Sequence, residues 1–137
     1  MNLLRVWLPS ISWMFLIFLF SSRERVQVSQ EEVVNFLFFK TLHVIEYALL
    51  FLLNVRALHL SFPTERLKQV MITAATLTVA YAITDEIHQF YVPTRDGKLT
   101  DVIIDGLGVT LAWIFLTKLL PKAPKKLQAW VKSWLKS

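Results

Sequence analysis

Residues 36–58 read FLFFKTLHVIEYALLFLLNVRAL, an apolar run long enough to cross a bilayer as a helix. In the first half of the run, ionisable side chains occur at spacings of three residues: Lys40, His43 and Glu46. On a helix this spacing places them along one stripe. A charge at the centre of a bilayer costs about 3 kcal/mol. We therefore expect the stripe to face other helices or a wet cavity, and not lipid.

Three further apolar runs occupy residues 3–20, 67–90 and 100–120. Of the 137 residues, 55% are hydrophobic, which is more than one small soluble core can hold. Because the loops are short, neighbouring helices should be antiparallel. We predict an all-α membrane protein with a four-transmembrane-helix bundle in residues 1–120. No small-x-small cleavage site follows the first run, so we expect that run to remain as a helix.

Residues 121–137 form a basic tail with a different pattern. Its apolar side chains recur at helical spacing, and its lysines fall mostly on the other face: Leu127, Trp130, Val131, Trp134 and Leu135 against Lys125, Lys126, Lys132 and Lys136. This pattern is typical of a helix lying in the membrane interface, with lysines on anionic lipid. We interpret the tail as a C-terminal interfacial amphipathic helix that anchors the chain. A lipid-sensing or partner-binding helix is the alternative.

The orientation follows from the lysines and arginines near the ends of the predicted spans. One side of the membrane receives ten of them: Arg5, Arg56, Arg66, Lys68, Lys118, Lys122, Lys125, Lys126, Lys132 and Lys136. The other side receives four: Arg23, Arg25, Arg95 and Lys98. Since basic loops favour the cytoplasm, both termini should be cytoplasmic. Arg23 and Arg25 lie in the first loop, where we expect them to be solvated.

Polar side chains gather at the predicted outward side. The second helix adds Tyr47 to its stripe, the third carries Tyr81, Asp85, Glu86, His88 and Gln89, and the fourth carries Asp101 and Asp105, followed by Gly108 and Ala112. Small residues at four-residue spacing let a neighbouring helix approach closely. The proline and glycine of the loop at residues 92–97 suit a tight turn. The three stripes should therefore converge near the outer leaflet.

The predicted cluster carries an excess of negative charge. Its carboxylates are Glu46, Asp85, Glu86, Asp101 and Asp105, whereas its fixed cations are Lys40 and Arg95. So many carboxylates cannot all stay ionised together unless histidines gain protons, some carboxylates keep protons, or a cation binds. The chain has no cysteine, so a metal such as Mg²⁺, Mn²⁺ or Zn²⁺ would need oxygen and imidazole ligands. The candidates are His43, Glu46, Asp85, Glu86 and Asp101.

The same residues resemble the VanZ-like family of bacterial membrane proteins, over residues 15–116. The similarity rests on the string DEIHQFYVPTR at residues 85–95, with Asp101, Asp105 and Gly108 after it, Lys40, His43, Glu46 and Tyr47 before it, and Phe20, Ser21 and Ser22 at the end of the first run. Two positions depart from the family pattern: Thr94 replaces a frequent glycine, and Asp105 replaces a frequent asparagine. The resemblance implies a small membrane protein of the bacterial cell envelope and does not specify a reaction. The family is named after a protein associated with low-level resistance to the antibiotic teicoplanin.

Together these patterns suggest an outward-facing pocket in the bacterial cytoplasmic membrane. It would bind or process an amphiphile, either a lipoglycopeptide such as teicoplanin or a lipid-linked wall precursor; nothing indicates a nucleic-acid partner. For turnover by a hydrolase or transferase, the catalytic candidates are His43, Glu46, Asp85, Glu86, Gln89 and Asp101. The ligand-binding candidates are Lys40, Tyr47, His88, Arg95 and Asp105.

Two other classes of function fit the same residues. A proton- or cation-coupled transporter would use the buried acids as a relay, although four spans without an internal repeat are few for a carrier. A scaffold would use the network only to hold the helices together, with Lys40 as a pairing residue and Arg95 as a clamp on carboxylates. A continuous polar path through the bundle would indicate transport, and a fully paired network would indicate a scaffold.

Overall fold

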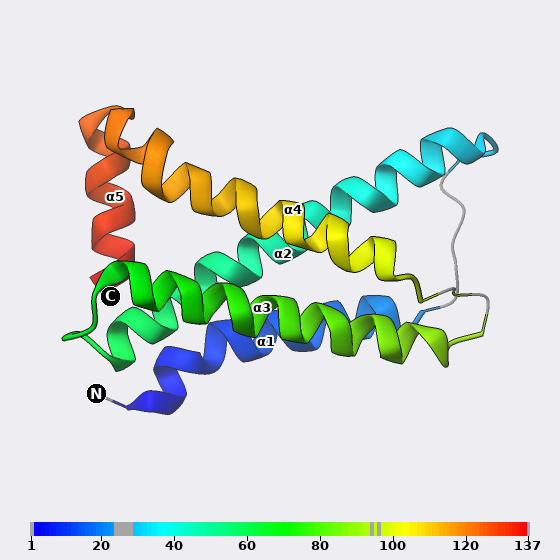
Figure 1. Ribbon diagram of the computed structural model, residues 1–137, viewed down its shortest axis with the longest axis horizontal. Helices are drawn as coiled ribbons and strands as arrows, with labels where there is room; N and C mark the ends of the chain where they lie inside the picture. The colour runs from blue at the N-terminus through cyan, green and yellow to red at the C-terminus, as the bar shows by residue number, and fades with distance from the viewer. Residues whose placement is uncertain (1, 24–28, 94, 96, 137) are drawn as a thin grey trace.

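The computed structural model describes residues 2–23, 29–93, 95 and 97–136, so Arg25, Thr94 and Asp96 lie outside the described residues. Helices are the only regular elements in these ranges (Figure 1). They are α1 (Leu3–Ser21), α2 (Glu32–Ser61), α3 (Leu67–Phe90), α4 (Leu99–Ile114) and α5 (Lys125–Lys136). α4 continues directly into a π-helical turn, η1 (Phe115–Leu119), and a 3₁₀ turn, η2 (Leu120–Lys122). The predicted all-α fold is confirmed.

Four of these helices are long and apolar enough to span a membrane: α1, α2, α3, and α4 with its continuation to Lys122. Large apolar side chains point outward on each of them, for example Phe15, Leu37, Ile87 and Leu111. Water would not tolerate so much exposed apolar surface, whereas lipid accommodates it. The chain is therefore a multi-pass membrane protein.

The four spans alternate in direction (Figure 1). We call the end at which α1 and α3 finish and α2 and α4 begin the site end, and the opposite end, where α5 lies, the tail end. α2 and α4 run in the same direction and cross near the middle of the bundle, while α1 and α3 lie along each other. Polar residues near the start of α2 and α4 and near the end of α3 are thus brought to the site end, as the sequence predicted.

The tail half of the bundle contains a largely apolar core. Its buried side chains are Phe51, Val55, Leu58, Val70, Met71, Ala74, Val109 and Ala112. Asn54 and Thr78, which are also buried in this half, hydrogen-bond to each other at 3.1 Å. Buried polar groups need such partners, and this bond joins α2 to α3 beside the apolar core.

Hydrogen bonds to main-chain oxygens fix how α1 lies on its neighbours. The Trp13 indole N–H donates to the main-chain oxygen of Glu46 on α2, at 2.9 Å. The Tyr81 hydroxyl on α3 donates to the main-chain oxygen of Met14, at 2.6 Å. Within lipid these bonds supply directionality that apolar contact alone does not give.

α2 and α4 approach each other closely at Gly108. A Cβ atom at this position would collide with the carbonyl oxygen of Val44 and lie 3.1 Å from the nitrogen of Ala48. Only a residue without a side chain allows this contact. The predicted role of a small residue on α4 is confirmed, and it explains how α4 can present its aspartates directly to α2.

α5 lies across the tail end of the bundle (Figure 1). Val131 is buried, Leu135 packs against the apolar core, and Arg56 of α2 donates to the main-chain oxygen of Trp134 at 3.1 Å. The predicted amphipathic helix therefore forms, and part of its apolar face packs on protein. Trp130 is 66% exposed and is available to the membrane interface. The domain boundary at residue 120 stays a prediction.

Candidate functional site

Two adjoining cavities lie between the helices at the site end. The first, which we call the α1 cavity, has a volume of about 270 Å³. Its walls combine apolar side chains with polar ones: Ile17, Phe20, Phe39 and Leu42 with Ser21, Arg23, His43, Glu46, Asp85, Gln89 and Arg95. The second, which we call the α4 cavity, has a volume of about 420 Å³ and includes Lys40 and Asp101. Both cavities are lined by Phe39, His43, Gln89 and Arg95. The two cavities are therefore compartments of one site.

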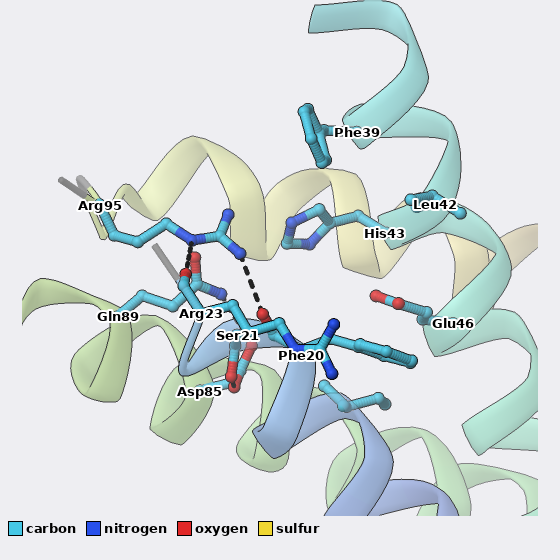
Figure 2. A pocket seen from close by; sticks show the side chains of 11 residues that line it. Phe20, Ser21, Arg23, Phe39, Leu42, His43, Glu46, Asp85, Gln89 and Arg95 are labelled. Atoms are coloured by element: carbon cyan, nitrogen blue, oxygen red, sulfur yellow. Dashed lines mark hydrogen bonds between the residues drawn. The ribbon is translucent and has the colours of Figure 1, made fainter. Parts of the chain in front are cut away.

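Asp85 joins α3 to the end of α1 (Figure 2). Ser21 Oγ donates to Asp85 Oδ1 at 2.6 Å, and Gln89 Nε2 donates to Asp85 Oδ2 at 2.9 Å. All three side chains are buried, and burial requires such pairing. Asp85 and Gln89 thus belong to a hydrogen-bonded network that fixes one wall of the α1 cavity.

Arg95, in the loop between α3 and α4, closes the end of α1 (Figure 2). Its Nε donates to the main-chain oxygen of Arg23 at 3.1 Å, and its Nη2 donates to that of Phe20 at 3.2 Å. The last carbonyls of a helix lack partners within the helix, and a cation there also suits the helix dipole. The alternative of a clamp on carboxylates is wrong for the part of the chain that the structure describes, where no acid lies within ion-pair distance of Arg95. Its charge faces both cavities.

Two pairs of side chains connect α2 to α4. Lys40 Nζ forms an ion pair with Asp101 Oδ1, and His43 Nδ1 lies 2.9 Å from Asp105 Oδ1. Because the two helices run in the same direction, residues three or four apart on each meet as successive pairs. Lys40 is thus a pairing residue. A histidine held by a carboxylate in this way can act as a general base or bind a metal.

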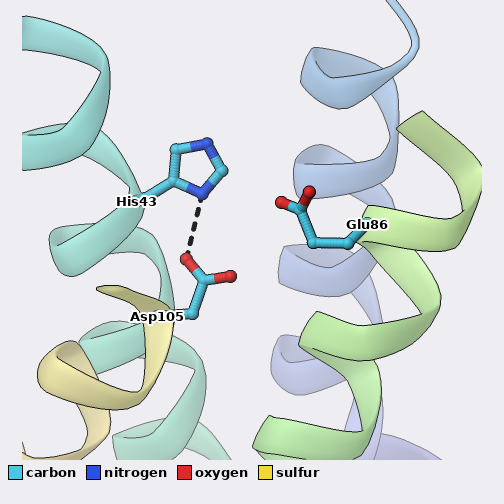
Figure 3. Close-up of side chains that lie close together, drawn as sticks. All are labelled: His43, Glu86 and Asp105. Carbon is cyan, nitrogen blue, oxygen red and sulfur yellow. Dashed lines mark hydrogen bonds and ion pairs between the residues drawn. The ribbon is translucent and has the colours of Figure 1, made fainter. Parts of the chain in front are cut away.

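Glu86 faces the His43–Asp105 pair from α3 (Figure 3). One potential ligand atom from each of His43, Glu86 and Asp105 lies within 4.8 Å of the other two. The main-chain N–H of Lys98 donates to Glu86 Oε2 at 2.8 Å. Gly97 permits this bond, because a Cβ atom there would collide with the main-chain oxygen of Glu86. Three helices and one loop therefore converge on this group of side chains.

Several polar atoms in this region have no partner among the described residues. Glu46 points into the α1 cavity, and its carboxylate accepts no hydrogen bond there (Figure 2). Asp105 is only 1% exposed, yet its Oδ2 is unpartnered, as is the buried hydroxyl of Tyr47. An unsatisfied buried polar group costs about 1–3 kcal/mol. These atoms mark positions where a proton, a water molecule or a bound group would lower the free energy.

Three of the predicted ligand-binding residues lie away from both cavities. His88 Nε2 is 2.9 Å from Ser22 Oγ, and its ring packs against Phe18 at 4.5 Å between centroids. Tyr47 is fully buried, and Asp105 lies behind His43. The structure therefore places His88 in the α1–α3 contact and gives the other two no direct access to a ligand in either cavity.

Several residues for which the sequence predicted no role in a site line the cavities, among them Ser21 and Phe39. Ser21 is followed by a second serine at the end of a largely apolar helix. These two polar side chains could have indicated a polar contact at that end. Phe39 lies four residues before His43, on the same stripe of α2. Its role in the site could not be predicted, because an apolar side chain is ordinary in an apolar run and only an ionisable one is unusual there.

These features define the class of protein: an all-α membrane protein with a polar site between its spanning helices at one end. A family model described as VanZ/LLP1 matches residues 6–120. The match covers most of the chain, so the chain belongs to the VanZ/LLP1 family, and the resemblance seen in the sequence is confirmed. No curated protein and no solved structure matches the chain.

Proposed function

We propose that the chain is a protein of the bacterial cytoplasmic membrane that binds an amphiphilic molecule of the cell envelope at its site end. The distribution of Lys and Arg supports cytoplasmic termini and an outward-facing site. The ligand has a lipid tail and a headgroup that carries both a negative charge and hydroxyl groups. A lipoglycopeptide such as teicoplanin and a lipid-linked wall precursor both have this chemistry.

One observation carries the proposal: Arg95 lines a cavity with apolar walls and has no acidic partner among the described residues. The oxygens to which it donates are neutral carbonyls, so no direct ion pair with a described acid balances its charge. Three of its five N–H groups remain after these two bonds. A guanidinium presented in this way suits a phosphate or carboxylate. Phe20, Phe39 and Leu42 would contact the adjoining apolar part of the ligand.

The acids of the α1 cavity select the remainder of the headgroup. Glu46 offers a carboxylate without a partner, and such a group accepts hydrogen bonds from sugar hydroxyls or from an ammonium group. The cavity volume, about 270 Å³, is near the lower limit for small-molecule sites. It therefore holds one charged group or one sugar ring of the headgroup, while the rest of the ligand stays outside the cavity.

A hydrolase or transferase acting on a lipid-linked headgroup is the second candidate. The observation that favours it is His43, which lines both cavities and is held by Asp105 at 2.9 Å. A positioned imidazole is the commonest general base, and it is also a common metal ligand. A protein that only binds its ligand would need neither a general base nor a metal ligand at this position.

Transport and a scaffold role have less support. The apolar core around Phe51 and Met71 lies between the cavities and the tail end, so the described residues give no continuous polar path. Against a scaffold, Glu46 and Asp105 Oδ2 lack partners and two cavities remain between the helices. A network with only a structural role would be fully paired.

The test is binding to the full chain in nanodiscs, with teicoplanin and a polyprenyl-diphosphate-linked disaccharide as separate probes. We expect Arg95→Gln to weaken the binding of at least one probe by about tenfold to a hundredfold, because it removes charge-assisted hydrogen bonds. Glu46→Gln should weaken the same probe without loss of fold, since this carboxylate has no bond to lose. The matched control is Arg66→Gln in the exposed loop at the tail end, which should bind as the parent does. The proposal is wrong if the parent binds neither probe, or if both site variants fold and bind normally.

A further inference from the structure

We propose that His43, Glu86 and Asp105 form a binding site for one divalent transition-metal ion, with Zn²⁺ as the best match. The three side chains come from α2, α3 and α4, and they meet beside the two cavities (Figure 3). This inference goes beyond the proposed binding of an amphiphile and does not depend on it.

The three side chains are close enough to hold one ion after a change in side-chain torsions. The three potential ligand atoms lie within 4.8 Å of one another. Nitrogen and oxygen ligands lie about 2.0–2.2 Å from a tetrahedral Zn²⁺, so its ligand atoms are about 3.3–3.6 Å apart. His43 and Asp105 are already in contact, with 2.9 Å between Nδ1 and Oδ1, and metal binding would replace the proton that they share. A movement of about 1 Å at the most widely separated pair, which rotation of the Glu86 side chain can supply, would complete the set.

An unpartnered oxygen supplies independent support. Asp105 Oδ2 is buried, accepts no hydrogen bond from the described residues, and belongs to a side chain that is 1% exposed. Figure 3 shows this oxygen directed toward Glu86, away from the hydrogen bond to His43. Two carboxylates that face each other inside a membrane protein repel unless a proton or a cation lies between them. A metal ion at this position would satisfy Asp105 Oδ2 and remove the repulsion.

The charge of the three side chains also matches a divalent cation. A neutral imidazole with two carboxylates carries two negative charges, which Zn²⁺ neutralises. The nearby ion pair between Lys40 and Asp101 is already balanced, so it supplies no cation to this group. Without an ion or an added proton, the two carboxylates would repel each other.

The surroundings provide the support that metal ligands require. The Lys98 N–H donates to Glu86 Oε2 at 2.8 Å, which leaves Oε1 for the ion and holds the carboxylate in place. Partners of this kind orient ligands in metal sites. The mixed nitrogen and oxygen set favours Zn²⁺ or Mn²⁺ over Mg²⁺, which prefers oxygen alone. Three protein ligands leave a coordination position for water or a ligand group, and His43 lines both cavities.

The first test measures metal content and affinity in the purified full chain. After chelation and dialysis, we expect titration with Zn²⁺ to show one ion per chain, with Mn²⁺ binding more weakly and Mg²⁺ not binding. Asp105→Asn and Glu86→Gln should each weaken Zn²⁺ binding at least tenfold. Glu65→Gln is the control: it removes an exposed carboxylate in the loop at the tail end, far from the three side chains, and it should keep the parent affinity. Folded Asp105→Asn and Glu86→Gln variants that bind Zn²⁺ like the parent would overturn the proposal.

A second test gives a signal that does not rely on loss of binding. We expect His43→Cys, loaded with Co²⁺, to show a thiolate-to-metal charge-transfer band, because the new sulfur would replace a ligand nitrogen. His88→Cys, on the α1-facing side of α3, should show none. Absence of the band in folded, Co²⁺-treated His43→Cys, or an equal band in His88→Cys, contradicts the site.

The two proposals fail separately. Zinc titration needs no amphiphile, and the effect of Arg95→Gln on amphiphile binding can be measured in chelator-treated protein. If Zn²⁺ does not bind while the Arg95 effect persists, only the metal site is wrong. If Zn²⁺ binds while neither amphiphile does, only the proposed function is wrong.

Discussion

The two halves of the bundle use the same four helices but differ in how their side chains are satisfied. In the tail half, apolar side chains such as Phe51 and Met71 are fully packed, and the buried pair Asn54–Thr78 is hydrogen-bonded. In the site half, two cavities lie between the helices, the Glu46 carboxylate accepts no hydrogen bond, and Asp105 Oδ2 is unpartnered. The tail half also has a pocket beside Leu58 and an unpartnered His59 Nδ1, but the buried acids of the described residues all lie in the site half. The difference indicates that packing in the tail half stabilises the fold while the site half tolerates unpaired acids. Changes in the two halves should therefore affect stability and binding differently.

The largest expected effect on stability comes from Phe51→Ala in the tail half. Phe51 is fully buried in the apolar core, and removing such a ring costs about 3–5 kcal/mol through lost contacts and the remaining cavity. The measurement is reversible unfolding in mixed micelles. Phe15→Ala, which removes an exposed ring on α1, is the control and should change stability by less than about 0.5 kcal/mol. Equal effects of the two variants would contradict a close-packed core.

A smaller loss of stability is expected at the contact between α2 and α4. Gly108→Ala places a Cβ atom against the Val44 carbonyl oxygen, and such overpacking costs about 1–3 kcal/mol. Gly106→Ala, two residues earlier on the same helix, meets nothing within 4 Å and should gain up to about 1 kcal/mol from helix propensity. Opposite signs for the two alanines, measured by the same unfolding assay, would confirm the close approach. A stabilising Gly108→Ala would show that the helices are further apart.

Next in size is Ser21→Ala at the boundary between α1 and α3. The variant removes the 2.6 Å hydrogen bond to buried Asp85, and we expect a loss of about 1–2 kcal/mol. Ser12→Ala, at an exposed position on the same helix, should be neutral. If Ser21→Ala is also neutral, then the hydrogen bond from Ser21 to Asp85 does not stabilise the fold or the wall of the α1 cavity.

The smallest expected effect on stability comes from Glu46→Gln, and it separates the two halves most clearly. The Glu46 carboxylate has no partner among the described residues, so the free energy of unfolding should change by less than about 0.5 kcal/mol. Amphiphile binding should nevertheless weaken, in contrast to Phe51→Ala, which should leave the affinity of the folded fraction unchanged. A large loss of stability in Glu46→Gln would show that this residue belongs to the structural network.

The sequence predicted the spans well because the hydropathy of each span is a local property. The third span was predicted at residues 67–90, and α3 covers Leu67–Phe90. The second was predicted at residues 36–58, whereas α2 extends over Glu32–Ser61. Hydropathy indicates where the lipid ends and not where the helix ends, because a helix can continue into polar surroundings.

The site was predictable only in part, because periodicity does not show which neighbour each side of a helix faces. The sequence pattern grouped Glu86 with His88. Side chains two positions apart on a helix, however, point in directions that differ by about 200°. Glu86 accordingly faces Asp105, while His88 faces Ser22 on α1. The partners of Arg95 were not predictable for another reason, since they are main-chain oxygens, which leave no mark in a pattern of side chains.

The hydrogen bond between Trp13 and the main chain of α2 affects how much freedom a ligand must restrict. The Trp13 indole holds the main chain at Glu46, while the carboxylate of the same residue stays unbound. The backbone at this position is thus preorganised, and a ligand has to restrict only the side-chain torsions of Glu46, which costs about 0.5–1.5 kcal/mol for a flexible side chain. Trp13→Phe should therefore weaken binding through added motion of Glu46, although Trp13 lines neither cavity.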